Sequence, residues 1–119
     1  MAEKKTLEDI ISGHEARNAS LRRVFLEKKV DLTEPRKIEC HFWTWSPKDA
    51  AQLAESLKGR GFEILTQHPA AAAGDPARWN LEAAVRQSIE LTMRPEFTDE
   101  LVRLADSHGG LYDGWGTSV

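Results

Sequence analysis

The sequence predicts an α+β domain, and three observations lead to that class. Segments with a two-residue hydrophobic period alternate with segments whose apolar residues recur at helical spacing. Helix-start signals stand between them, notably Ser46-Pro47 and Pro95. At 119 residues, with 40% hydrophobic and 29% charged residues, the chain has the size and composition of one globular domain. We therefore expect one sheet and a few helices around a single core.

The first predicted element is a helix over residues 6–29. Thr6 can cap it, and Asp9 stands three residues later as a weak capping box. Apolar residues recur along one stripe at helical spacing, namely Leu7, Ile10, Ile11, Leu21, Val24 and Phe25. The stripe indicates that one side of this helix is buried.

Polar residues interrupt this stripe near the middle of the helix. They are His14, Arg17 and Asn18, and Gly13 weakens the helix at the same place. We expect either a break near Ser12-Gly13 or a helix that leaves the core there. Residues 30–35 are predicted to be a loop that ends at a proline.

A strand is predicted over residues 37–45, followed at once by a helix. Alternation places Ile38, Cys40 and Phe42 on one face, and Glu39, His41, Trp43 and Trp45 on the other. Ser46 is a suitable N-cap, and Pro47 suits the first helical position. The buried stripe of that helix is Ala50, Leu53, Ala54 and Leu57, and Gly59 or Gly61 ends it.

Two more strands and a helix complete the predicted domain. Residues 62–68 form a strand with Phe62 and Ile64 inward, and residues 69–76 form a loop. A long strand is predicted over residues 78–91, because one parity carries Trp79, Leu81, Ala83, Val85, Ile89 and Leu91. Pro95 begins the last helix, whose stripe is Phe97, Leu101, Leu104 and Ala105. Gly109-Gly110 ends it, and the tail is a short strand.

The element order after the first helix is therefore β-α-β-β-α-β. The leading arrangement is the ferredoxin-like split βαβ fold, an antiparallel four-stranded sheet with two helices on one face. Residues 1–30 form an added N-terminal helical segment, and residues 31–119 form the ferredoxin-like part of a single domain. The open face of the sheet is available to bury the stripe of the N-terminal helix.

Charge and composition narrow the partner and the compartment. The net charge of −3 argues against general binding to a phosphate backbone, and it suits a protein partner with basic segments. No apolar run reaches the length of a membrane span and no export signal is visible, so we expect a cytoplasmic protein without membrane contact. The single Cys40 agrees with a reducing compartment.

The spacings typical of metal sites and nucleotide loops do not occur in the sequence. No HxxxH, CxxC or HExxH motif is present, and no GxGxxG or GxxxxGK[ST] motif is present. Cys40 and His41 are neighbours in a strand, so their side chains point to opposite faces and cannot act together as nucleophile and base. We predict a protein that is not an enzyme, with no catalytic residues, no metal and no cofactor.

Trp43 and Trp45 are the first candidate binding group. Alternation places both with His41 on the sheet face away from the helices. Our favoured expectation is that the N-terminal helix covers them there. If they are exposed instead, they are natural anchors for a protein, or a face that stacks bases in a single-strand RNA or small-ligand binding module.

Tyr112, Asp113 and Trp115 in the tail are the second candidate group. Asp113 before Gly114 is typical of a turn in which the carboxylate bonds nearby backbone N–H groups. The alternative is a fixed aromatic and acidic patch that receives a partner. The candidate partner-binding residues are therefore Trp43, Trp45, Tyr112, Asp113 and Trp115.

Several short motifs together resemble the RraB-type family of ribonuclease E inhibitors, the regulators of ribonuclease E activity B. In chain order they are Asp31-Leu32, Pro35-Arg36, Phe42-Trp43, Gly61-Phe62, Trp79 and Tyr112-Asp113-Gly114-Trp115-Gly116. The resemblance covers roughly residues 18–116, and its strength lies in the order and spacing of the motifs.

The resemblance implies a ferredoxin-like fold and a protein without catalysis. Members of this family bind ribonuclease E and lower its activity, without binding the RNA as substrate. We therefore expect a regulator with a protein partner, ribonuclease E being the candidate, and no direct nucleic-acid binding. The chain is expected to be a monomer, or a dimer that pairs through its N-terminal helix.

Overall fold

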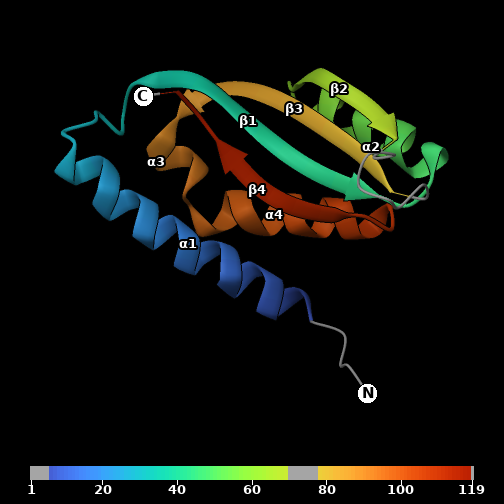
Figure 1. The fold of residues 1–119 in the computed structure, drawn as a ribbon, viewed down its shortest axis with the longest axis horizontal. Coiled ribbons are helices and arrows are strands. Elements are labelled where there is room, and N and C mark those ends of the chain that lie inside the picture. The colour runs from blue at the N-terminus through green and yellow to red at the C-terminus, as the bar shows by residue number, and fades with distance from the viewer. Residues whose placement is uncertain (1–5, 70–77, 119) are drawn as a thin grey trace.

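Four antiparallel strands form one sheet in the order β2-β3-β1-β4, and the helices lie on one side of it (Figure 1). The computed structural model describes residues 6–69 and 78–118. Its elements are α1 (Leu7–Glu27), β1 (Pro35–Thr44), α2 (Pro47–Gly59), β2 (Glu63–Pro69), β3 (Trp79–Ser88), α3 (Ile89–Thr92), α4 (Pro95–Ser107) and β4 (Leu111–Gly116). The loop predicted over residues 69–76 lies, from residue 70 onward, outside the described residues.

The strand order confirms the predicted ferredoxin-like α+β fold. Strand β3 lies between β1 and β2, and strand β1 lies between β3 and β4. Each of the helices α2 and α4 therefore crosses over one intervening antiparallel strand, which is the split βαβ arrangement. β1 and β3 form the centre of the sheet, and β2 and β4 form its edges.

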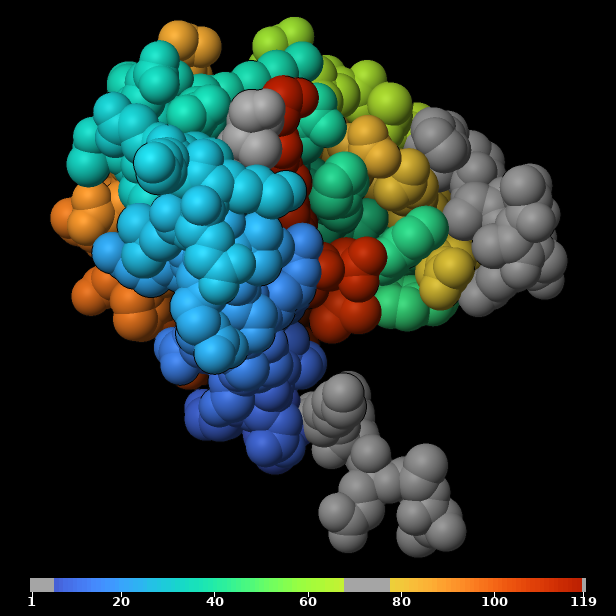
Figure 2. Space-filling model, turned by 60° about the vertical axis from the view of Figure 1, so that its left-hand side comes forward, coloured from blue at the N-terminus to red at the C-terminus, as the bar shows by residue number. Residues whose placement is uncertain are grey.

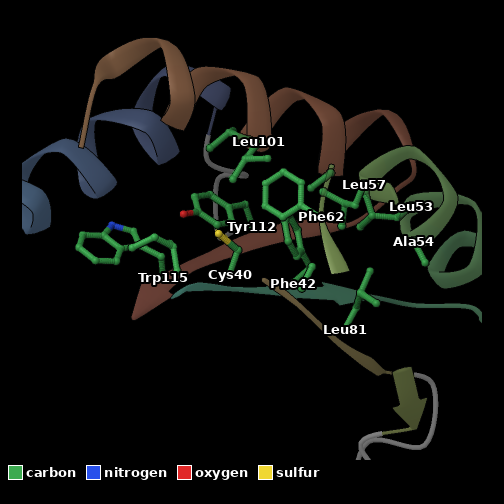
Figure 3. Close-up of a cluster of buried hydrophobic side chains, with 14 of the residues drawn as sticks. Cys40, Phe42, Leu53, Ala54, Leu57, Phe62, Leu81, Leu101, Tyr112 and Trp115 are labelled. Atoms are coloured by element: carbon green, nitrogen blue, oxygen red, sulfur yellow. The ribbon is translucent and has the colours of Figure 1, made fainter. Parts of the chain in front are cut away.

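The core lies between the sheet and the helices α2 and α4 (Figure 3). The inward residues of β1 are Ile38, Cys40, Phe42 and Thr44, and all are fully buried, as the alternation predicts for the first three. Cys40 lies opposite Ala83 of β3 and Trp115 of β4. Helix α2 buries Ala50, Leu53, Ala54 and Leu57 against this layer, and α4 buries Leu101, Val102 and Ala105.

The predicted N-caps are confirmed in the described structure. The Thr6 hydroxyl oxygen accepts from the Asp9 backbone N–H at 3.1 Å, and the Asp9 carboxylate accepts from the Thr6 N–H. The Ser46 hydroxyl oxygen accepts from the Asp49 N–H at 3.1 Å. Each cap satisfies an amide that the helix itself leaves without a partner.

The prediction of one long strand over residues 78–91 is wrong at its end. Strand β3 ends at Ser88, and the short helix α3 follows. The Ser88 hydroxyl oxygen caps that helix by accepting from the Leu91 N–H at 3.1 Å. Ile89 is still buried, but Leu91 is 40% exposed. The alternation of apolar residues over 78–91 is therefore compatible with a continuous strand and also with a strand followed by a short capped helix. The N-cap at Ser88 favours the second.

Helix α1 differs from the prediction in two respects. It is continuous through Ser12 and Gly13 and stays packed on the core beyond them, with Leu21 and Phe25 against it, whereas we expected either a break there or a helix that leaves the core. It also packs beside α4, on the helical side of the sheet, rather than over the open face (Figure 1). Figure 2 shows the blue helix against the red C-terminal strand. Among the described helices, none is long and apolar enough to cross a membrane.

Candidate functional site

A bulge in β4 sets the geometry of the C-terminal tail. The register shifts between His41 and Phe42, so that Tyr112 lies opposite Phe42 and Trp115 lies opposite Cys40. Tyr112 and Trp115 are three positions apart, and strict alternation would send them to opposite faces. Because the bulge adds one residue, both side chains enter the core, and Asp113 remains exposed.

Glycine is required at the bulge. Gly114 has φ +126°, a backbone region that side chains rarely adopt. A Cβ there would also lie 3.3 Å from the Arg17 Nη1 atom, because helix α1 passes close to the strand. The positive φ is therefore the main reason for glycine here, because the end of the Arg17 side chain needs only a small shift to admit a Cβ.

Helix α1 is joined to β4 by three polar contacts from its interrupted stripe. His14 Nε2 lies 3.0 Å from the Tyr112 carbonyl oxygen. Arg17 Nη2 donates to the Trp115 carbonyl oxygen at 3.0 Å. The indole Nε1–H of Trp115 donates to Asn18 Oδ1 at 2.9 Å. The three polar residues at spacing i, i+3 and i+4 thus form one face that recognises the strand.

These contacts occur at an exposed edge of the sheet. Within the part of the chain that the structure describes, β4 pairs with β1 alone, so the other side of β4 carries backbone groups without a strand partner. Side chains of α1 take up two of the carbonyl oxygens. The helix therefore protects the edge by hydrogen bonding as well as by apolar packing from Phe25, whose ring centroid lies 6.4 Å from that of Trp115.

His14 is half-buried and stacks on Tyr112, with ring centroids 4.8 Å apart. Its Nε2 must carry a hydrogen, because a carbonyl oxygen only accepts. Burial lowers the pKa of His14 below its ordinary value, and nearby Arg17 adds to the lowering. The hydrogen bond to the Tyr112 carbonyl and the charge of Asp113 oppose this shift of the pKa without cancelling it. The folded chain therefore favours the neutral ring more than the unfolded chain does.

We expect the free energy of unfolding to fall as the pH drops below about 6.5, with His14 responsible for part of the fall. The unfolded chain binds the proton at a higher pH than the folded chain does. The stability that neutral His14 contributes is therefore fully present above about pH 6.5. It is lost as the pH falls from there to the lowered pKa of the folded chain. Urea unfolding on both sides of this pH should show a smaller pH dependence for His14→Gln. His41→Gln is the matched control, and equal slopes for all three proteins would contradict the burial of His14.

A groove lies between α1 and the start of β4. It consists of one hollow of about 660 Å³ and a second of about 470 Å³, which share Ile10 and Leu111. We call this surface the α1–β4 groove. Other side chains that line the groove are Leu7, Asp9, His14, Arg17, Trp45, Asp106 and Asp113. The groove is thus built by the N-terminal half of α1, the end of α4, the start of β4 and the residue after β1.

The five predicted partner-binding residues do not form one surface. Tyr112 and Trp115 are buried, at 2% and 4% exposure, and so support the surface from beneath. Asp113 and Trp45 border the α1–β4 groove. Trp43 is half-buried on the open sheet face, where the guanidinium carbon of Arg78 lies 4.1 Å from its ring centroid.

The prediction that Trp43 and Trp45 share the open face is wrong. Strand β1 ends at Thr44, so alternation no longer applies at Trp45, which is 47% exposed beside α1. The expectation that α1 covers the Trp43 face is wrong as well. The open face of the sheet therefore carries Trp43 without Trp45, so the pair of tryptophans expected for stacking RNA bases is not formed there.

The remaining candidates for chemistry have structural roles. Cys40 is fully buried, and burial raises the pKa of its thiol to about 12. Burial raises the pKa of the Tyr112 hydroxyl as well. His41 lies on the other face, 3.4 Å from a Glu82 carboxylate oxygen. Within residues 6–69 and 78–118, no group of three His, Cys, Asp or Glu side chains could hold a metal ion.

Comparison with known proteins adds one finding to this geometry. The family model described as "Regulator of ribonuclease activity B" matches residues 15–117. That span includes all of β4. It also includes α1 from residue 15 onward, and therefore Arg17 and Asn18. A search of curated proteins gives no match.

Proposed function

This chain belongs to the regulator of ribonuclease activity B family, and from that membership we propose that it binds a ribonuclease and lowers its activity by direct contact. The observation that carries the proposal is the family match, which spans residues 15–117 and therefore nearly the whole fold. Ribonuclease E is the proposed partner, because the sequence motifs resemble inhibitors of that enzyme.

Regulation in this proposal requires no chemistry from the chain itself. Cys40 is held as a neutral thiol in the core and cannot reach a substrate. His41 points to the opposite face and pairs with a carboxylate. These placements support a protein that acts by occupying a surface of the enzyme.

The α1–β4 groove is the contact surface we assign to this function. It combines an exposed tryptophan with acidic side chains, and it lies on elements that the core holds in place. Exposed aromatic residues are frequent anchors of protein interfaces. The β4, α4 and Trp45 side of the groove lies within the span of the family match, together with Arg17, whereas the lining residues from Thr6 to His14 precede it.

We expect added protein to slow cleavage of an RNA substrate by purified ribonuclease E, and the slowing to saturate with concentration. Calorimetry without RNA should show binding of the two proteins. Two controls separate binding to the enzyme from shielding of the RNA. A gel shift of the RNA with this protein alone should be absent, and the slowing should not depend on an excess of this protein over RNA. An unchanged cleavage rate together with no heat of binding would refute the proposal.

A further inference from the structure

Among the described residues, the lining of the α1–β4 groove carries more negative than positive charge. Asp9, Asp106 and Asp113 line it. Arg17 is the one arginine among the described residues that line it, and it donates to the Trp115 carbonyl oxygen. Carboxylates clustered along a depression attract cationic groups and speed their association.

The acidic character continues on the other flank of α1. A separate hollow between α1 and α4 is lined by Glu15, Glu96 and Asp99 together with apolar atoms. The basic residues Arg22, Arg23 and Lys28 belong instead to the C-terminal end of α1. Arg103 of α4 pairs with Asp99 and with Glu8 of α1, so part of the charge on this flank is compensated, and the groups expected to attract a cation are the carboxylates of the α1–β4 groove.

Apolar surface accompanies the carboxylates. Trp45 is 47% exposed at one end of the groove, and Leu7, Ile10 and Leu111 are half-buried there. A segment that binds such a surface needs a cation for the acids and an apolar side chain for the indole. Tryptophan also attracts cations through its ring face, which strengthens the preference for arginine.

We propose that the α1–β4 groove binds a basic segment of a partner protein, with arginine or lysine paired to Asp9, Asp106 and Asp113 and an apolar residue against Trp45. The groove consists of two adjoining hollows that share Ile10 and Leu111, which gives room for a segment that presents more than one side chain. The inference rests on the proposed function for the identity of the partner, and it adds the chemistry of the segment recognised.

The test uses the full chain and a synthetic peptide that alternates arginine with leucine. A matched peptide carries glutamine in place of every arginine. We expect the arginine peptide to bind, to perturb tryptophan fluorescence and to bind more weakly as salt is raised, because the pairs lie at the surface. The glutamine peptide should bind weakly or not at all. Equal binding of both peptides would overturn the role of charge.

A charge-matched pair of triple variants locates the site. The groove variant carries Asp9→Asn, Asp106→Asn and Asp113→Asn, and the control carries Glu34→Gln, Glu55→Gln and Glu63→Gln, which lie outside the groove. The groove variant should bind the arginine peptide roughly tenfold more weakly, and the control should match the wild type within about twofold. Equal loss in both triples would mean that net charge, and not the groove, attracts the peptide.

Some results would assign the groove to a different ligand, and each of these would also overturn the proposal. Self-association abolished by the groove variant, without peptide binding, would assign the groove to the basic end of α1 in a second copy. Binding of oligonucleotide in preference to the arginine peptide would assign it to nucleic acid. If ribonuclease E binds the wild type and the groove variant equally, this inference fails and the proposed function stands. If the peptide binds and ribonuclease E does not, the proposed function fails alone.

Discussion

Replacing Trp115 with alanine should lower the free energy of unfolding by about 3–5 kcal/mol, the cost of removing a large buried aromatic side chain. Trp115 is 4% exposed and lies where α1, β4 and the core meet. The change removes its contact with Phe25 and its donor to Asn18. Urea unfolding monitored by far-ultraviolet circular dichroism measures the loss. Small domains have about 5–15 kcal/mol in total, so the variant should be close to unfolding.

Trp45→Ala is the matched control, because it is the same substitution at an exposed site. Surface changes of this kind usually stay within about 0.5 kcal/mol. Hydrogen exchange adds a local readout, since amides of α1 should lose protection in Trp115→Ala well before those of β1 and β3. Equal stability of the two alanine variants would show that α1 does not dock on β4 in solution.

Trp115→Phe isolates the hydrogen bond from the packing. It leaves Asn18 Oδ1 buried without its donor, which costs about 1–3 kcal/mol in addition to the lost ring area. Asn18 Nδ2 already has no hydrogen-bond partner among the described residues. Adding Asn18→Leu to Trp115→Phe should therefore recover part of the loss, because two apolar partners leave no polar atom unsatisfied.

The sequence was sufficient for the order of strands and main helices. The reasons are local: Ser46-Pro47 and Pro95 mark helix starts, and Ile38, Cys40 and Phe42 alternate on the buried face. Alternation failed where the chain departs from a regular strand. The clearest cases are Trp45, which follows the last strand residue, and the bulge at Asp113.

The position of α1 could not be derived from its apolar stripe. An apolar stripe indicates that one side of a helix is buried, but it does not indicate which element covers it. The sequence alone allowed α1 to pack on either face of the sheet. His14, Arg17 and Asn18 looked like defects in the stripe when they were considered within the helix alone. Their partners are carbonyls and an indole of β4, about a hundred residues away in sequence. A polar set at spacing i, i+3 and i+4 inside a buried stripe is the signal that could have indicated such a contact.

The family match and the geometry concern different aspects of function. The match gives a class of activity and a span of 15–117, without residues. The geometry shows that α1 fixes the shape of the groove, because the same helix seals the β4 edge and supplies Asp9 and Ile10 to the groove wall. Variants that loosen this contact should therefore weaken binding and stability together, whereas variants of Asp106 and Asp113 should weaken binding alone. Asp9 also belongs to the capping box of α1, so its variant should add a small loss of stability.

Gly110→Ala should destabilise the fold by about 1–3 kcal/mol, the usual cost of forcing extra volume into a packed region. A Cβ at Gly110 would lie 2.6 Å from the Trp43 carbonyl oxygen and 3.0 Å from Thr44 Cγ2. Neither neighbour can move easily, because Trp43 belongs to a central strand and Thr44 is fully buried. The Gly110 N–H also donates to the Ala105 carbonyl oxygen at 2.8 Å, which ties the end of α4 to the start of β4.

Gly59→Ala separates this steric effect from the general effect of adding a methyl group to glycine. A Cβ at Gly59, the last residue of α2, meets no heavy atom within 4 Å. Alanine is favoured over glycine in helices by up to about 1 kcal/mol, so this control should be neutral or slightly more stable. Since Gly110 also lines the α1–β4 groove, its variant should lose affinity for the arginine peptide while Gly59→Ala keeps it. Equal stability of the two variants would mean that β4 begins farther from β1 than these distances place it.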